Sequence, residues 1–274
     1  MTGQEPSDVL FIGNATTLIR HDGFTLLTDP NFLHRGQRAH LGYGLTSRRR
    51  TEPALNVGDL PPLDAIVLSH MHGDHWDRIA RHGLDKRVPV ITTRHLRRQG
   101  FTRAVGLRTW GEHRLHKNGR TLTVTSLPAR HAPGPARYLL PPVMGSMLDF
   151  TRPDGQVDLR LHISGDTLLD PILCEIPVRF PGIDVGLVHL GGTKLLGLLV
   201  TMDAAQGVRW VRLIAPRVAV PVHYDDYTVF SSPLSAFRRA VARAGLSDRV
   251  RYAERGQAFP LPARTVPAAH APRP

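Results

Sequence analysis

Metal-binding side chains are concentrated in one short segment of the chain, SHMHGDHWD. Four ligand-type residues lie within six positions there: His70, His72, Asp74 and His75. His70 and His72 are two residues apart, so in extended backbone they project to the same side and can bind one ion. Asp74 and His75 follow Gly73, where the chain can turn freely, and can reach a second ion beside the first. Imidazole and carboxylate together favour zinc, with manganese and iron as alternatives.

This segment directly follows an apolar run, residues 65–68, whose length and β-branched content predict a short buried strand. Loops that follow strands are where α/β scaffolds commonly present functional groups. The alternative is a polar, histidine-rich loop that binds no metal. Four ligand-type side chains at this spacing favour the metal site.

The spacing His70-x-His72-x-Asp74-His75 resembles the HxHxDH signature of the metallo-β-lactamase superfamily. That family adds a histidine downstream, then an aspartate after a strand, and then a histidine near the C-terminal end. Three residues match these positions, and each follows a strand-like run: His131, Asp166 and His223. The resemblance extends from the first predicted strands to about residue 258.

The resemblance implies a site for two divalent cations, with zinc expected and manganese or iron as alternatives. Its ligands would be His70, His72 and His131 for the first ion, Asp74, His75 and His223 for the second, and Asp166 bridging both. A hydroxide between the two ions would be the nucleophile. We assign the catalytic role to Asp74 and His223, with Asp74 steering the attacking oxygen.

Asp29 ends a predicted strand in the sequence Thr28-Asp29-Pro30. An aspartate at this point in the superfamily is buried and holds the metal loop, so we expect Asp29 to support the site without binding an ion. A role in capping the turn is the alternative. Two irregular segments, residues 31–60 and 132–142, are expected to form loops over the site and to determine the choice of substrate.

Strands alternate with helices in both halves of the chain, which is typical of an α/β fold. The resemblance implies more, a four-layer αββα sandwich in which two mixed β-sheets face each other and helices lie outside. We expect one domain over residues 1–260 and a flexible Pro/Ala/Arg-rich tail over residues 261–274. Among the elements, we predict helices over residues 95–100 and 169–178 and a last strand over 250–252.

The composition indicates which partners and which cellular compartment to expect. The net charge of +12 comes almost entirely from arginine, and such a surface can attract nucleic acid. A solvated basic surface is the simpler interpretation, because most of the charges are scattered. No apolar run approaches the ~20 residues that a membrane-spanning helix needs. The absence of an evident signal peptide and the single cysteine predict a cytoplasmic protein.

Several functions remain open at this point. Asp166 stands near where some β-lactamase subclasses carry a cysteine, which disfavours antibiotic hydrolysis. Two segments near the start of the chain, residues 13–18 and 28–30, resemble the opening sequence of one branch of the superfamily. That branch contains ascorbate-6-phosphate lactonase and N-acylphosphatidylethanolamine phospholipase D. We predict a hydrolase of a small, anionic ester, either a phosphodiester or a lactone. The alternatives are a nuclease or RNA-processing enzyme, for which charge is the only support, and a metal-binding protein without hydrolytic activity.

Other reactive side chains receive more ordinary interpretations. We interpret His189, after a predicted buried strand, as an interior histidine with a satisfied hydrogen bond. Cys174 is predicted to be a small core residue of a helix. Asp226, close to His223, fits a solvated turn or a substrate contact equally well.

Overall fold

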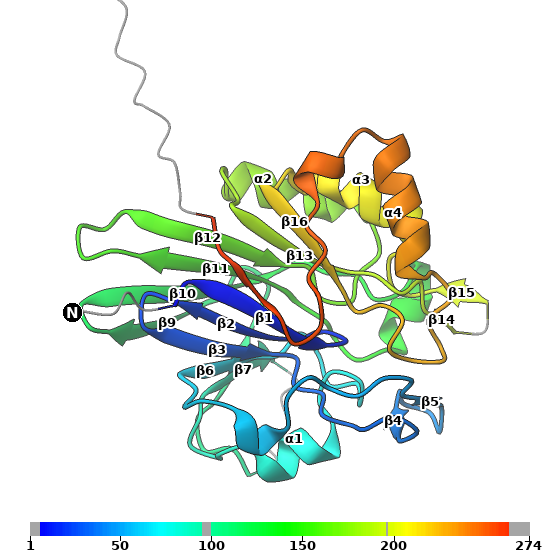
Figure 1. Cartoon of the computed structure of the whole chain (residues 1–274), viewed down its shortest axis with the longest axis horizontal. Coiled ribbons are helices and arrows are strands. Elements are labelled where there is room, and N and C mark those ends of the chain that lie inside the picture. The colour runs from blue at the N-terminus through cyan, green and yellow to red at the C-terminus, as the bar shows by residue number, and fades with distance from the viewer. Residues whose placement is uncertain (1–5, 95–99, 196, 263–274) are drawn as a thin grey trace, which may run out of the picture.

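Two mixed β-sheets lie face to face in the computed structural model, and helices cover the outer face of each (Figure 1). The structure describes residues 6–94, 100–195 and 197–262. Helices α2, α3 and α4 lie above the sheets in Figure 1, and α1 lies below them. This arrangement confirms the expected αββα sandwich.

The first sheet has seven strands in the order β17-β1-β2-β3-β6-β7-β8. Strands β1 to β3 are antiparallel neighbours, whereas β3, β6, β7 and β8 run parallel. Their bounds are β1 (Asp8–Gly13), β2 (Thr16–His21), β3 (Phe24–Thr28), β6 (Ala65–Val67), β7 (Val90–Thr93), β8 (Ala104–Leu107) and β17 (Ala258–Pro260).

The second sheet has six strands in the order β16-β13-β12-β11-β10-β9. Neighbouring strands from β9 to β12 are antiparallel, whereas β12, β13 and β16 run parallel to one another. Their bounds are β9 (Glu112–Lys117), β10 (Arg120–Leu127), β11 (Gly145–Thr151), β12 (Val157–Ile163), β13 (Val185–His189) and β16 (Val218–Val222).

Helices and two small hairpins complete the described fold. The helices are α1 (Arg78–Gly83), α2 (Glu175–Arg179), α3 (Ala204–Ile214) and α4 (Leu234–Arg243), with 3-10 turns η1 (Val57–Asp59), η2 (Gly134–Tyr138), η3 (Pro171–Cys174) and η4 (Ser247–Arg249). The hairpins pair β4 (Arg38–His40) with β5 (Thr46–Arg48), and β14 (Lys194–Leu195) with β15 (Leu198–Leu199). Both hairpins lie at the right-hand end of the sandwich in Figure 1. None of the helices in the described ranges is long and apolar enough to cross a membrane.

Alternating residues of the strands fill different layers of the core, as a side-chain period of two requires. In β1, Val9 and Phe11 pack between the two sheets, whereas Ile12 faces the layer that contains α1. In β13, Val185 packs between the sheets, and Val188 packs against the helices on the other side. Both strands are therefore apolar on both faces, which is why they lie inside the sandwich.

Some expected elements are wrong. The helix predicted over 169–178 begins later, as a 3-10 turn that opens at Pro171 and continues directly into the short α2, because Pro177 has no N–H to donate to the Leu173 carbonyl in a regular α-helix. The strand predicted over 250–252 is reduced to one bridge between Val250 and Ala219, and the last strand is β17 instead. Cys174 is exposed rather than part of the core.

Two expectations fall wholly or partly outside the described residues. Most of the helix predicted over 95–100 lies there, and so does most of the predicted tail, residues 263–274. Leu261, the first residue of that tail, is buried and donates a backbone hydrogen bond to the Ser7 carbonyl. The packed part of the chain therefore continues past residue 260.

Candidate metal centre

The expected ligands meet at one edge of the sandwich, each shortly after a strand ends. His70 and His72 follow β6, His131 follows β10, Asp166 follows β12, and His223 follows β16. Strands β10, β12 and β16 run in the same direction within the second sheet, so their carboxyl ends lie at the same edge. The topology thus brings together side chains that are up to 153 residues apart in sequence (70 to 223).

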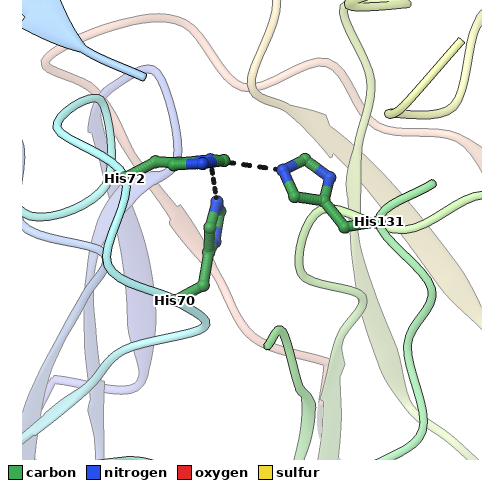
Figure 2. A group of neighbouring side chains, drawn as sticks. All are labelled: His70, His72 and His131. Atoms are coloured by element: carbon green, nitrogen blue, oxygen red, sulfur yellow. Dashed lines mark hydrogen bonds between the residues drawn. The ribbon is translucent and has the colours of Figure 1, made fainter. Parts of the chain in front are cut away.

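Three of the expected ligands, His70, His72 and His131, point toward one another (Figure 2). The Nδ1 atom of His72 lies 2.9 Å from Nε2 of His70 and 3.2 Å from Nε2 of His131. Zinc bound tetrahedrally at about 2.0–2.1 Å from each nitrogen separates its ligand atoms by about 3.3 Å. The separations among these nitrogens are therefore those of one metal site.

The second expected ligand group, Asp74, His75 and His223, lies beside the first. Nε2 of His75 is 3.1 Å from Nε2 of His223, and Oδ2 of Asp74 is 3.4 Å from the same His223 atom. Asp166 lies between the groups, since its carboxylate clusters with His70 of the first and His75 of the second. Its Oδ2 atom is 3.3 Å from Nε2 of His75. All seven expected ligands are thus brought together.

The ring nitrogens that face away from the clusters have hydrogen-bond partners. Nδ1 of His131 donates to the Val200 carbonyl at 2.9 Å, and Nδ1 of His223 donates to the Leu190 carbonyl at 3.0 Å. Nδ1 of His75 lies 3.1 Å from the Asp29 carboxylate. Metal-bound histidines commonly donate their second N–H to a carbonyl or carboxylate, which leaves the other nitrogen free as a ligand. The side chains present therefore fit bound metal ions.

Electrostatics differ between the two groups. Burial, reinforced by the neighbouring imidazoles, lowers the pKa of His70 well below its ordinary value, and burial lowers the pKa of His72 to about 3. Burial also lowers the pKa of His131. These three side chains are consequently neutral at neutral pH, and neutral imidazole is the form that binds metal.

The second group contains a carboxylate and lies beside Asp166, and the pKa values of its histidines are raised rather than lowered. Burial opposes the shift, but the carboxylates of Asp166 and Asp74 raise the pKa of His75 well above its ordinary value, and Asp166 likewise raises that of His223. Burial would raise the pKa of Asp74, yet His75 and His223 lower it to about 2. The same two histidines hold the pKa of Asp166 well below its usual range, despite burial. Both carboxylates are therefore anionic, as metal ligands must be.

Asp29 is buried behind the metal loop, at the place expected for a supporting residue. Its Oδ1 atom accepts a hydrogen bond from the Ser69 backbone N–H at 2.6 Å, and its Oδ2 atom accepts one from the Ser69 hydroxyl at 2.9 Å. With the contact to His75, one carboxylate holds both the start of the loop and a ligand ring. Asp29 has a φ of +37°, which is uncommon for a residue other than glycine and is tolerated best by Asn and Asp.

Asn14 is a site residue to which the sequence interpretation gave no role. Its side-chain amide donates to the Asp74 carbonyl at 2.7 Å, and its own carbonyl accepts a hydrogen bond from the His223 backbone N–H at 2.7 Å. Asn14 thereby joins the first hairpin to both candidate catalytic residues. The signal in the sequence was the Gly13-Asn14 pair after a strand, since Asn tolerates the left-handed conformation, here with φ +54°.

His189 also belongs to this centre. Its Nδ1 atom lies 3.2 Å from Oδ1 of Asp166, and Thr201 donates to the other carboxylate oxygen at 3.2 Å. The expectation that His189 is an interior histidine with a hydrogen bond is therefore correct. Its partner is Asp166, which lies between the two candidate ligand groups. Burial lowers the pKa of His189, so a neutral ring fixes the orientation of Asp166.

The segment 31–60 does more than cover the site. Arg49 is buried and donates from Nη1 to the Asn31 carbonyl at 2.9 Å. The Asn31 side-chain amide in turn donates to the Gly73 carbonyl at 3.1 Å. The Asp77 carboxylate accepts backbone hydrogen bonds from Phe32 at 2.5 Å and Leu33 at 2.7 Å. This segment therefore supports the metal loop from behind.

Two glycines of the site are required by close backbone packing. A Cβ on Gly73 would lie 2.7 Å from the His40 backbone nitrogen, and one on Gly165 would lie 2.5 Å from the Met144 carbonyl oxygen. Gly165 also has a φ of +63°, whereas Gly73 is not in the left-handed region. Gly73 is thus needed for space at the metal loop, and not for the free turn that we expected.

A small cavity of about 10 Å³ opens onto the ligands. The described residues that line it are His72, Asp74, His131 and Asp166 together with Leu41, Thr193, Leu195 and Val200. No arginine is among them, although arginine supplies most of the positive charge of the chain. Apart from Thr193, the lining residues that are not candidate ligands are therefore apolar.

Comparison with known proteins agrees with this architecture. Residues 25–224, more than half of the chain, match the family described as Beta-lactamase superfamily domain. A UPF0173 metal-dependent hydrolase from Deinococcus radiodurans is 30% identical over 193 residues, which are 68% of this chain and 76% of that protein. An N-acyl-phosphatidylethanolamine-hydrolyzing phospholipase D 1 from Caenorhabditis elegans is 31% identical over 134 residues, 44% of this chain and 37% of that protein.

Solved structures share the fold at lower sequence identity. The isothiocyanate hydrolase from Delia radicum gut bacteria has a TM-score of 0.77 and 21% identity, with 92% of this chain and 98% of that chain covered. A possible metal-dependent hydrolase from Veillonella parvula has a TM-score of 0.78 and 22% identity, with 93% and 100% covered. Sequence family and fold agree, so the chain belongs to the metallo-β-lactamase superfamily, among its metal-dependent hydrolases.

Proposed function

We propose that the protein is a dinuclear metal-dependent hydrolase, with zinc as the expected metal, that cleaves a small ester. The observation that supports this most directly is the position of Asp166 between two complete ligand groups. A carboxylate so placed can bind two ions roughly 3.5–4 Å apart, which is the separation used by two-metal hydrolases. Manganese and iron suit the same ligands.

The chain's own residues have separable roles in this proposal. Bound divalent cations supply Lewis acidity, which lowers the pKa of water toward neutrality and polarises the scissile bond. The Oδ1 atom of Asp74 is buried and has no hydrogen-bond partner among the described residues, and Asp74 lines the cavity. It can therefore accept a hydrogen bond from the attacking water and orient it. His223, held by the Leu190 carbonyl, places its Nε2 atom 3.4 Å from the other Asp74 oxygen, so these two atoms can bind the same ion.

A nuclease or RNA-processing role is the second candidate, and the net charge of +12 is its support. The described residues that line the cavity include no arginine or lysine, so the phosphate contacts that such a role needs are missing at the point of entry. Neither the phospholipase D nor the isothiocyanate hydrolase among the similar proteins is named as acting on nucleic acid. We therefore favour a small ester as the substrate.

The experiment is a measurement of metal content combined with hydrolysis of a lactone, a p-nitrophenyl ester and bis(p-nitrophenyl) phosphate. About two metal ions per chain are expected, with turnover that chelation abolishes and added zinc or manganese restores. The substrate that is cleaved distinguishes carboxylic esters from phosphodiesters. A metal-loaded protein that cleaves none of the three would contradict the proposal.

An Asp29→Asn variant tests how the metal loop is supported. It keeps the size of the side chain but removes the negative charge that lies beside His75. Because residues that hold metal ligands typically contribute 10–100-fold to affinity, metal affinity is expected to fall by about that factor. Competition with a chromogenic chelator measures it, and Asp85→Asn, at an exposed position, is the control. Equal affinity in the two variants would leave Asp29 as no more than a turn residue.

A further inference from the structure

We propose that the substrate carries a short, uncharged apolar arm, which binds in a groove beside the metal centre; this rests on the hydrolase function proposed above. The groove has a volume of about 240 Å³. Its described lining includes Tyr43, Leu45, Leu139, Leu195, Leu198 and Val200. We call it the apolar groove.

The apolar groove adjoins the cavity at the candidate ligands. Leu195 and Val200 line both of them. The backbone carbonyl of Val200 also accepts the hydrogen bond from Nδ1 of His131, so the wall of the groove is attached directly to a candidate ligand. A substrate whose reactive bond lies at Asp74 and Asp166 would therefore have its next atoms against Leu195 and Val200.

Exposed apolar side chains gather around this groove. Six large hydrophobic residues are exposed in the described part of the chain, and five lie in its walls or next to them: Tyr43, Leu45, Tyr138, Leu139 and Leu198. The sixth, Val178, lies on α2. Scattered exposed hydrophobic residues are ordinary, whereas a contiguous group beside a site marks a surface that binds an apolar ligand.

The lining limits what can bind. None of the described residues that line the apolar groove is charged, so a phosphate or carboxylate there would lose its hydration without a partner. The volume is somewhat below the range of about 300–1,000 Å³ typical of pockets for drug-sized ligands. A short alkyl or aryl group fits these limits, and our expectation of an anionic substrate is not supported on this side of the site.

Two loops are tied together above the groove. The Tyr43 hydroxyl donates to the Leu139 carbonyl at 2.6 Å, which joins the segment 31–60 to the segment 132–142. Gly42, Tyr43 and Gly44 all have positive φ, at +88°, +51° and +75°. A tyrosine is rarely held in this conformation, and such strain is found mostly at functional sites. The turn presents the aromatic ring to the groove.

Equilibrium binding of neutral alcohols tests the groove without relying on turnover. Isothermal titration calorimetry with butan-1-ol, hexan-1-ol and octan-1-ol is expected to show a dissociation constant that falls by up to about fourfold per added methylene. The double variant Leu139→Ser/Leu198→Ser should flatten this dependence, since both side chains are exposed and can change without disturbing the core. Val178→Ser, at an exposed position on α2 outside the groove, is the matched control and should keep the wild-type slope. Equal slopes in the two variants, or no dependence on chain length, would overturn the proposal.

Turnover of p-nitrophenyl acetate, butyrate and octanoate by the metal-loaded enzyme then tests the role of the groove in catalysis. We expect kcat/KM to rise with chain length in the wild type and in Val178→Ser, and to rise less in the double variant. Hydrolysis of the acetate with no dependence on chain length would overturn the apolar arm and leave the hydrolase intact. Alcohol binding with the expected slope, but no hydrolysis of any ester, would instead refute the proposed ester hydrolase and the substrate role of the groove with it.

Discussion

An Asp166→Ala variant is expected to lose most of its bound metal and at least about a thousandfold in turnover. Among the described residues, Asp166 is the one carboxylate that clusters with residues of both ligand groups, so its loss weakens both at once. Lewis-acid stabilisation contributes several kcal/mol, and each 1.36 kcal/mol corresponds to a factor of ten in rate. Removal of about 4 kcal/mol gives the expected factor. The same reasoning predicts a comparable loss for His72→Ala.

Metal content and kcat/KM, measured on the same preparation, check this prediction. Asp154→Ala is the control, because that aspartate lies in the exposed turn between β11 and β12, at the opposite end of β12 from Asp166. Asp166→Asn separates charge from shape, since the amide oxygen can still accept the hydrogen bond from His189, whereas the amide NH2 would have to donate to the Thr201 hydroxyl instead. Wild-type metal content and turnover in Asp166→Ala would exclude the two-metal arrangement.

An Asp226→Ala variant is expected to lower the free energy of unfolding by about 3–5 kcal/mol, as removal of one partner from a buried ion pair does. Asp226 is fully buried. Its carboxylate accepts from the Asn14 backbone N–H at 2.9 Å and lies 2.7 Å from Nη2 of Arg255. It also lies 4.0 Å from Nη2 of the buried Arg49.

The large effect comes from Arg49. Two of its guanidinium nitrogens, Nε and Nη2, have no hydrogen-bond acceptor among the described residues. Loss of the Asp226 carboxylate would remove the one ion-pair partner within 4.0 Å of this buried charge among the described residues, which is the costly case. Urea denaturation measures the change. Asp225→Asn, at the exposed neighbouring position, should change stability by less than about 0.5 kcal/mol. A loss below about 1 kcal/mol in Asp226→Ala would show that Arg49 is compensated in another way.

These two predictions depend on the sequence to different degrees. Asp166 can be identified from the amino-acid sequence, because an aspartate after a strand completes the pattern begun by His70 and His72. The sequence suggests a solvated or substrate-facing position for Asp226, whereas the structure shows this side chain buried among arginines. Nothing local distinguishes a buried aspartate of this kind, since its partners, Arg49 and Arg255, are remote in sequence.

The sequence by itself indicated the candidate ligands, through the resemblance to the superfamily, and the type of fold. Each ligand follows a strand-like run, and strand alternation and ligand spacing are properties of short segments, so they can be read from neighbouring residues. Tertiary structure alone decided which residues support the ligands and what surrounds the cavity. Asn14, Arg49 and His189 act on the centre through contacts between distant segments, and the apolar groove combines three loops that no local pattern joins. Such contacts form only when the sheets pack, because packing is what brings separate loops to one edge of the sandwich.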